Sequence, residues 1–97
     1  MRDYFLEADA TEDLDSIYEY IARENRTAAA KMLHDIYATF EVIAANPDAG
    51  RRRNELASGL QSLVFRNYVI LYRVTKDEIR INRILHGARD LSKIVFE

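Results

Sequence analysis

The sequence predicts an α+β fold, in which an N-terminal strand is followed by an antiparallel two-helix hairpin packed on a small twisted antiparallel sheet. Between residues 9 and 45, apolar side chains recur with the period of a helix in two successive stretches. Residues 63–90 hold three runs rich in Val, Ile, Leu, Tyr and Phe, separated by turn sequences, which is typical of a meander. No linker, repeat or low-complexity segment interrupts the 97 residues, so we expect one domain, 1–97.

The first strand is predicted at residues 4–8, a short apolar run directly before a helix start. Asp9 and Glu12 have the spacing of a capping box, in which each side chain accepts a hydrogen bond from the backbone amide of the other residue. The helix that follows places its apolar residues on one stripe, wide enough to cover a sheet: Leu14, Ile17, Tyr18 and Ile21.

The second helix is predicted to begin after Thr27, a suitable N-cap, and to end at Asn46, because the residue before Pro47 disfavours the helical region. Its apolar stripe consists of Ala29, Leu33, Ile36, Phe40 and Ile43. The link between the two helices is short, which predicts an antiparallel hairpin whose stripes cover the sheet.

The meander is expected to turn at Arg66-Asn67 and at Lys76-Asp77, so that Ile70 faces Arg83. Because side chains alternate along a strand, one face should lie under the helices: Tyr68, Ile70, Tyr72, Val74, Ile79, Ile81 and Leu85. The opposite face should carry Val69, Leu71, Arg73, Arg80, Asn82, Ile84 and His86. Arg83 has the parity of the apolar face, so we expect it to pair with a carboxylate such as Asp13, because a buried unpaired guanidinium is very costly.

The net charge is −2, but the two halves of the chain differ strongly. Residues 1–48 hold eleven Asp and Glu against four Lys and Arg, whereas residues 49–97 hold five against ten. This asymmetry leaves two interpretations open: a weak attraction between helices and sheet with the remainder solvated, or a basic surface for an acidic partner. The absence of Cys, of an apolar signal segment and of a membrane-length apolar run predicts a cytoplasmic protein without membrane contacts.

The sequence contains no nucleophile, metal or phosphate-loop motif, so we expect neither a metal nor another cofactor. His86, at a strand end before Gly87, is either a hydrogen-bonded structural histidine or a proton carrier. The basic triplet at residues 51–53 is either solvated or able to hold phosphates.

Several motifs together resemble the toxins of the RelE/ParE superfamily. They are Asp13-Leu14, IYEYIA (17–22), NPDAGRR (46–52), YVILYRV (68–74) and LHGARD (85–90). The resemblance spans nearly the full chain and points to the ParE branch. It implies the toxin of a type II toxin–antitoxin module, neutralised by a ParD-like antitoxin whose disordered C-terminal half wraps around it; DNA is contacted only indirectly, through the antitoxin.

The two branches of the superfamily differ in activity. ParE-like members resemble inhibitors of DNA gyrase that need no active site, so no catalytic residue is expected. The alternative is a RelE-type ribosome-dependent mRNA endoribonuclease, whose residues here would be Arg66, Arg73, His86 and Arg89. Ser62 and Val64 stand where RelE-like lysines would be, and Val95-Phe96 lacks a hydroxyl, which disfavours RNA cleavage. A third alternative is a family member that has lost toxicity and only binds its antitoxin.

The resemblance also suggests where the partners bind. The antitoxin is expected on the sheet face away from the helices, at Val69, Leu71, Arg73, Arg80 and Ile84, because a lone small domain should not expose such an apolar patch. The target, DNA gyrase, is expected at C-terminal residues that the helical core does not need: Arg89, Lys93, Ile94, Val95 and Phe96.

Overall fold

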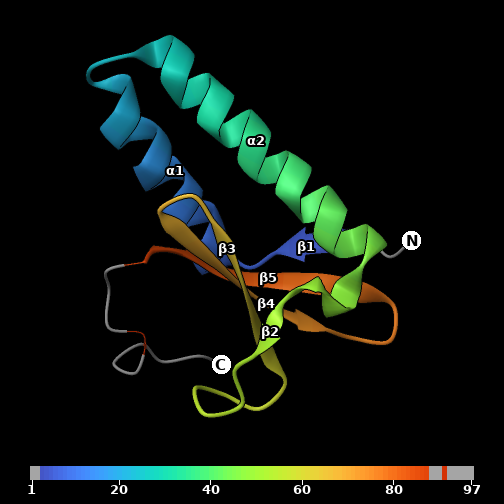
Figure 1. The fold of residues 1–97 in the computed structure, drawn as a ribbon. Helices are drawn as coiled ribbons and strands as arrows, with labels where there is room; N and C mark the ends of the chain where they lie inside the picture. Colours follow the sequence, from blue (N-terminus) through green and yellow to red (C-terminus); the bar gives the residue numbers. More distant parts are fainter. Residues whose placement is uncertain (1–2, 88–90, 92–97) are drawn as a thin grey trace.

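The computed structural model describes residues 3–87 and 91, which form a helical hairpin on one face of a five-stranded sheet (Figure 1). The hairpin consists of two long helices, each of which spans the apolar stripe that the sequence shows for it. In chain order, the elements are β1 (Asp3–Leu6), α1 (Ala8–Ala22), α2 (Arg26–Ala45), the 3-10 turn η1 (Pro47–Ala49), β2 (Arg51–Arg52), β3 (Leu60–Phe65), β4 (Tyr68–Val74) and β5 (Glu78–His86). The α+β class and the order of elements are confirmed.

The sheet has the strand order β1-β5-β4-β3-β2. Strands β2 to β5 pair antiparallel, as the meander predicted, but β1 pairs parallel to β5. The expectation of a wholly antiparallel sheet is therefore wrong. Between β1 and its neighbour β5 the chain makes the hairpin and the meander, and a long connection of this kind permits a parallel pair where a tight turn does not.

A bulge in β5 changes the expected register. Val74 faces Ile79 and Tyr72 faces Ile81, as predicted, but Leu71 faces Arg83 and Ile70 faces Ile84. Asn82 is thus one extra residue in β5, and beyond it the side chains exchange faces. The predicted pair of Ile70 with Arg83 is wrong, and so are the predicted faces of Ile84 and Leu85.

The sheet therefore has a hydrophobic cluster on each face. The buried residues of the helix-side cluster are Ala10, Leu14, Ile17, Ile36, Phe40, Ile43, Ile70, Tyr72, Ile79, Ile81 and Ile84. The cluster on the other face is smaller and consists of Leu60, Leu71 and Leu85, covered by Leu56, Ala57, Val69 and Leu91. The segment between β2 and β3 thus closes part of the sheet face that we expected to be open.

Both helix starts differ from their predictions. The Glu7 amide donates to the Ile81 carbonyl oxygen (2.9 Å), and α1 begins at the next residue, before Asp9 can act as N-cap. The predicted capping box is therefore wrong, because the strand leads into the helix without a linker. In α2 the cap is Asn25, whose Oδ1 accepts from the Ala28 amide (3.0 Å), two residues earlier than the predicted Thr27.

A buried tyrosine holds the turn that leads into β2. The Tyr72 hydroxyl donates to the Pro47 carbonyl oxygen (2.9 Å) and accepts from the Gly50 amide (2.8 Å). Burial raises the pKa of Tyr72 above its usual value. A Cβ atom added at Gly50 would lie 2.4 Å from this hydroxyl, so the close approach requires glycine. The NPDAG sequence is thereby fixed to the centre of β4.

We expect Tyr72→Phe to lower the free energy of unfolding by about 1–3 kcal/mol, because the Gly50 amide and the Pro47 carbonyl lose their partner in a partly buried place. Urea unfolding followed by circular dichroism measures the change. Tyr20→Phe is the matched control, since Tyr20 is 72% exposed. Equal midpoints for Tyr72→Phe and the wild type would contradict this assignment.

Candidate protein-binding surfaces

The structure revises the predicted antitoxin surface. Leu71 is 0% exposed and Ile84 is 2% exposed, so the expectation that both lie open on the sheet face is wrong. Leu71 belongs to the smaller cluster under Leu56 and Ala57, and the bulge turns Ile84 toward the helices. Val69 is half-buried at the edge of the smaller cluster. Neither Leu71 nor Ile84 offers surface to a partner in this structure.

The two arginines predicted for the same surface already have protein partners. Arg80 donates to the carboxylates of Glu7 (2.6 Å) and Glu78 (2.7 Å), and its guanidinium carbon lies 4.5 Å from the ring centre of Phe5. Hydrogen bonding to Glu7 is the main cause that raises the pKa of Arg80. Arg73 donates to the Ser58 carbonyl oxygen (3.1 Å). The charge of Arg80 is therefore compensated by two carboxylates, and Arg73 is hydrogen-bonded to the backbone.

The residues of the RNA-cleaving alternative are spread along the sheet. Arg66, in the β3–β4 turn, and His86 line one groove of ≈ 330 Å³. Arg73 lies five residues beyond the start of β4, about 17 Å of extended strand away. Arg89 lies outside the described residues. Among the described members of the set, only Arg66 and His86 thus share a site.

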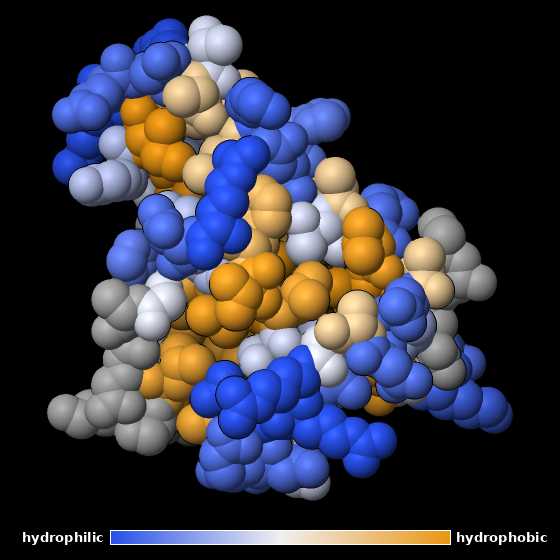
Figure 2. Space-filling view, in the orientation of Figure 1, coloured by the Kyte–Doolittle hydropathy of each residue, from blue (hydrophilic) through white to orange (hydrophobic). Residues whose placement is uncertain are grey.

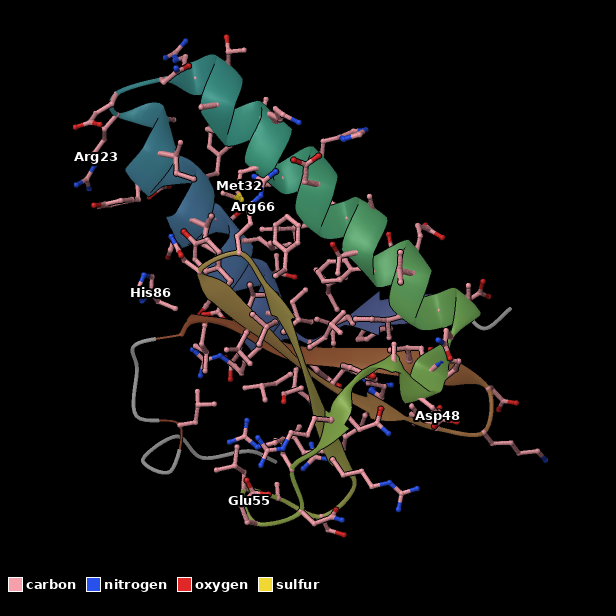
Figure 3. The ribbon with its side chains drawn as sticks, viewed as in Figure 1. Arg23, Met32, Asp48, Glu55, Arg66 and His86 are labelled. Carbon is pink, nitrogen blue, oxygen red and sulfur yellow. The ribbon has the colours of Figure 1, made fainter. Side chains whose placement is uncertain are left out.

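Arg66 is bound to the helical hairpin. Its Nη2 donates to Asp35 Oδ2 (2.8 Å) and its Nη1 contacts the Met32 sulfur (3.8 Å), and Figure 3 shows Arg66 beside Met32. The Lys31 hydrogen bond is the main cause that lowers the pKa of Asp35, and the charge of Arg66 adds to it. Arg66 has φ 54°, as a tight turn requires. The turn is therefore tied to α2 by an exposed ion pair.

The expected pairing of Arg83 with Asp13 is confirmed. Arg83 donates to both carboxylate oxygens of Asp13 (2.8 and 3.0 Å), and Asp13 also accepts from the Ile84 amide (2.9 Å). Asp13 thus accepts the hydrogen bond of a β5 backbone amide at a position beyond the end of β1. Next to this pair, an open groove of ≈ 500 Å³ is lined by residues of α1 and the sheet end, including Tyr20, Tyr68 and His86. The rings of Tyr68 and His86 pack edge to face, with 5.9 Å between their centres.

A second surface, which sequence reasoning missed, lies between α2 and β3. The hairpin packs mainly on β5 and β1, and neither helix has its main contact with β3. Met32, Leu63 and Phe65 border the helix-side core but are only partly buried; we call these three the hydrophobic band. Figure 2 shows continuous hydrophobic surface between the hairpin and the sheet. In the sequence, the alternation of Leu63 and Phe65 with Val64 could have indicated that these two side chains share one face of the strand.

Residues 3–87 and 91 lack two further features. In this part of the chain, no cluster of His, Cys, Asp and Glu has the composition and spacing to hold a metal ion. None of the helices there combines the length and the apolarity needed to cross a membrane. The predicted target-binding residues Lys93, Ile94, Val95 and Phe96, like Arg89, lie outside the described part.

Comparison with known proteins decides the family. Residues 4–91 match the model of the ParE toxin of the type II toxin–antitoxin system parDE. The chain belongs to the ParE toxin family. It is 33% identical over 87 residues to toxin ParE1 of Caulobacter vibrioides, covering 89% of this chain and 90% of that one. Toxin ParE3 of the same organism is 31% identical over 81 residues, with 82% and 81% covered.

Solved structures agree with this family. The chromosomal ParDE system of P. aeruginosa superposes with a TM-score of 0.75 at 26% identity, covering 89% of this chain and 96% of that chain. The toxin–antitoxin complex DinJ-YafQ of E. coli has a TM-score of 0.64 at 12% identity, with 90% and 93% covered. The second likeness concerns the fold alone. The α+β fold of this chain is therefore the fold expected of a ParE toxin.

Proposed function

We propose that this ParE toxin acts in the cytoplasm by inhibiting DNA gyrase, and that a ParD-like antitoxin neutralises it. The observation that carries the antitoxin part is the hydrophobic band beside α2, on a chain whose structural relative comes from a ParDE system. A domain of this size is expected to cover such a band with a partner. DNA is contacted only through the antitoxin.

The antitoxin is proposed to bind by folding an initially disordered segment onto the hydrophobic band. An amphipathic helix laid beside α2 would bury Met32, Leu63 and Phe65, and the exposed Tyr37 of α2 lies on the same helix. Val69, Arg73 and Arg80 stay as proposed contacts on the other face of the sheet. Leu71 and Ile84 are left out because they are buried.

Inhibition of gyrase without RNA cleavage is supported by the arrangement of the alternative catalytic residues. RNA cleavage needs groups that activate the 2′-hydroxyl, neutralise the phosphate and assist the leaving oxygen around one atom. Arg66 is bound by Asp35, and Arg73 lies toward the other end of β4. Val69 also replaces the arginine that RelE-like enzymes carry after the tyrosine that opens this strand.

We expect the purified protein to block DNA supercoiling by gyrase and to leave ribosome-bound mRNA intact. A supercoiling assay and a ribosome-primed cleavage assay, run side by side, measure both activities. A chain truncated after Leu91, which keeps the Leu91 contact with the smaller cluster, is expected to lose gyrase inhibition while keeping its circular dichroism spectrum, because Lys93, Ile94, Val95 and Phe96 are the proposed target contacts.

Two outcomes would change the proposal. Codon-dependent cleavage with supercoiling unaffected would replace gyrase inhibition by the RelE-type activity. A folded, truncated chain that still inhibits gyrase would move the target contact away from the C-terminal residues.

A further inference from the structure

The outer edge strand β2 carries the uncompensated positive charge of the sheet. Arg53, Arg80 and Arg83 each form an ion pair with a carboxylate. Within the described ranges, Arg51 and Arg52 are exposed and belong to no ion pair. The pKa of Glu55 is lowered mainly by its hydrogen bond from Arg53, and the charge of Arg51 adds to this effect. The basic half of the chain is thus most available at β2.

This edge is held in place by buried structure. Gly50, directly before Arg51, donates to the fully buried Tyr72, which also holds Pro47. After Arg52, the Arg53 amide donates to the Leu60 carbonyl oxygen (2.8 Å). Because the backbone of this strand is fixed on both sides, pairing a second strand with it costs little further backbone entropy, which favours binding.

The geometry of β2 fits a second extended chain. Arg51 faces Ser62 and Arg52 faces Gln61, so the two guanidinium groups lie on opposite faces of the sheet. Because ladder bonds alternate and Arg53 bonds inward to Leu60, the peptide groups of Arg52 point away from the sheet. Beside Arg52 is a shallow depression of ≈ 150 Å³, lined also by Asn54, Gly59, Leu60 and Gln61, with room for one side chain.

We infer that the outer edge of β2 binds an extended acidic peptide segment of a protein partner. A peptide strand added to this edge would bond to the backbone of Arg52, and its alternating side chains would place carboxylates against Arg51 on one face and Arg52 on the other. A nucleic-acid strand has no row of peptide groups for this edge, and its phosphates would meet one face only.

The natural carrier of this segment is the antitoxin, and this assignment rests on the proposed function. It adds a second docking site on the sheet edge, away from the hydrophobic band. The contact also explains why the motif NPDAGRR couples a turn that needs Gly50 to two free arginines.

Fluorescence anisotropy with a labelled peptide that repeats Glu-Glu-Thr-Thr, and so presents carboxylates on both faces of a strand, tests the inference. We expect binding that weakens when ionic strength rises from about 0.05 M to about 0.5 M, since the contacts are exposed. Arg51→Gln with Arg52→Gln should weaken binding about tenfold, the effect of losing two exposed charge-assisted contacts. Arg23→Gln with Arg26→Gln, two exposed arginines at the hairpin tip, is the charge-matched control and should leave binding unchanged.

Other probes identify the ligand class. Equal binding by the β2 double variant and the wild type overturns the inference, as does equal binding of a proline-interrupted peptide of the same charge, which cannot form a strand. Tighter binding of an oligothymidylate of equal charge would replace the peptide by nucleic acid. With the product of a neighbouring ParD-like reading frame, no binding to the wild type would refute the proposed function, whereas equal binding to wild type and double variant would refute only the β2 site.

Discussion

Replacing Asp13 with alanine is expected to lower the free energy of unfolding by about 3 kcal/mol, out of the roughly 5–15 kcal/mol typical of a domain. The change removes both acceptors of Arg83 and the acceptor of the Ile84 amide. The two side chains of the pair are only 20% and 14% exposed, so water replaces these bonds poorly. The guanidinium would then lose its hydrogen-bonded carboxylate beside a hydrophobic core, and of the neighbouring acids Asp9 and Glu12 would still act on its charge.

Urea unfolding of Asp13→Ala against the wild type measures this effect. Asp15→Ala, an exposed position on the same helix, is the matched control and should change stability by less than about 0.5 kcal/mol. Adding Arg83→Ala to Asp13→Ala should restore part of the loss, because the unpaired charge is removed. A loss below about 1 kcal/mol for Asp13→Ala would show that the pair is solvated like an ordinary surface ion pair.

The Asp13 pair also explains how a short first strand closes the sheet. β1 ends at Leu6, opposite Ile81, and among the residues that the structure describes no strand pairs with the rest of β5 on that side. A bare edge there would expose unpaired backbone groups. The Asp13 carboxylate takes the place of a strand carbonyl for the Ile84 amide, so α1 acts at the same time as cover and as edge.

Much of this fold could be predicted because its signals are local. The turns at Arg66-Asn67 and Lys76-Asp77 lie between alternating apolar runs, and the pairing of Tyr72 with Ile81 follows from the second turn. Arg83 in an apolar pattern required a carboxylate, and Asp13 is the first carboxylate on the covering helix that reaches it.

The bulge at Asn82 could not be predicted, because one inserted residue leaves the composition of a strand unchanged while reversing its faces. This single residue explains the errors at Ile84 and Leu85. The second cluster was missed for a different reason. Its cover comes from Leu56 and Ala57, in an irregular segment whose path depends on the Tyr72 contact with the preceding turn.

The hydrophobic band was missed because periodicity describes one element at a time. The sheet has five strands in the order β1-β5-β4-β3-β2, which is wider than the part that the hairpin contacts. The hairpin sits over β1 and β5, so the uncovered part falls on β3. A partner surface can thus arise from the mismatch between the hairpin and the sheet.

Phe65→Ala is expected to weaken antitoxin binding about 30-fold or more, the loss of about 2 kcal/mol that marks an aromatic hot spot. Phe65 belongs to the hydrophobic band, and the Arg66 guanidinium carbon lies 5.0 Å from its ring centre. Isothermal titration calorimetry with a cognate ParD-like antitoxin measures the affinity, on protein whose fold has been checked by circular dichroism.

Val64→Ala is the matched control for the hydrophobic band, because Val64 is adjacent in sequence and 72% exposed but points to the other face of β3. It should change the affinity by less than about threefold, which corresponds to about 0.6 kcal/mol. The reverse result, a large loss for Val64→Ala with Phe65→Ala unaffected, would place the antitoxin on the sheet face beside Val69. Because neighbouring strand residues face opposite sides, these two alanine substitutions distinguish the two faces of the sheet as docking sites.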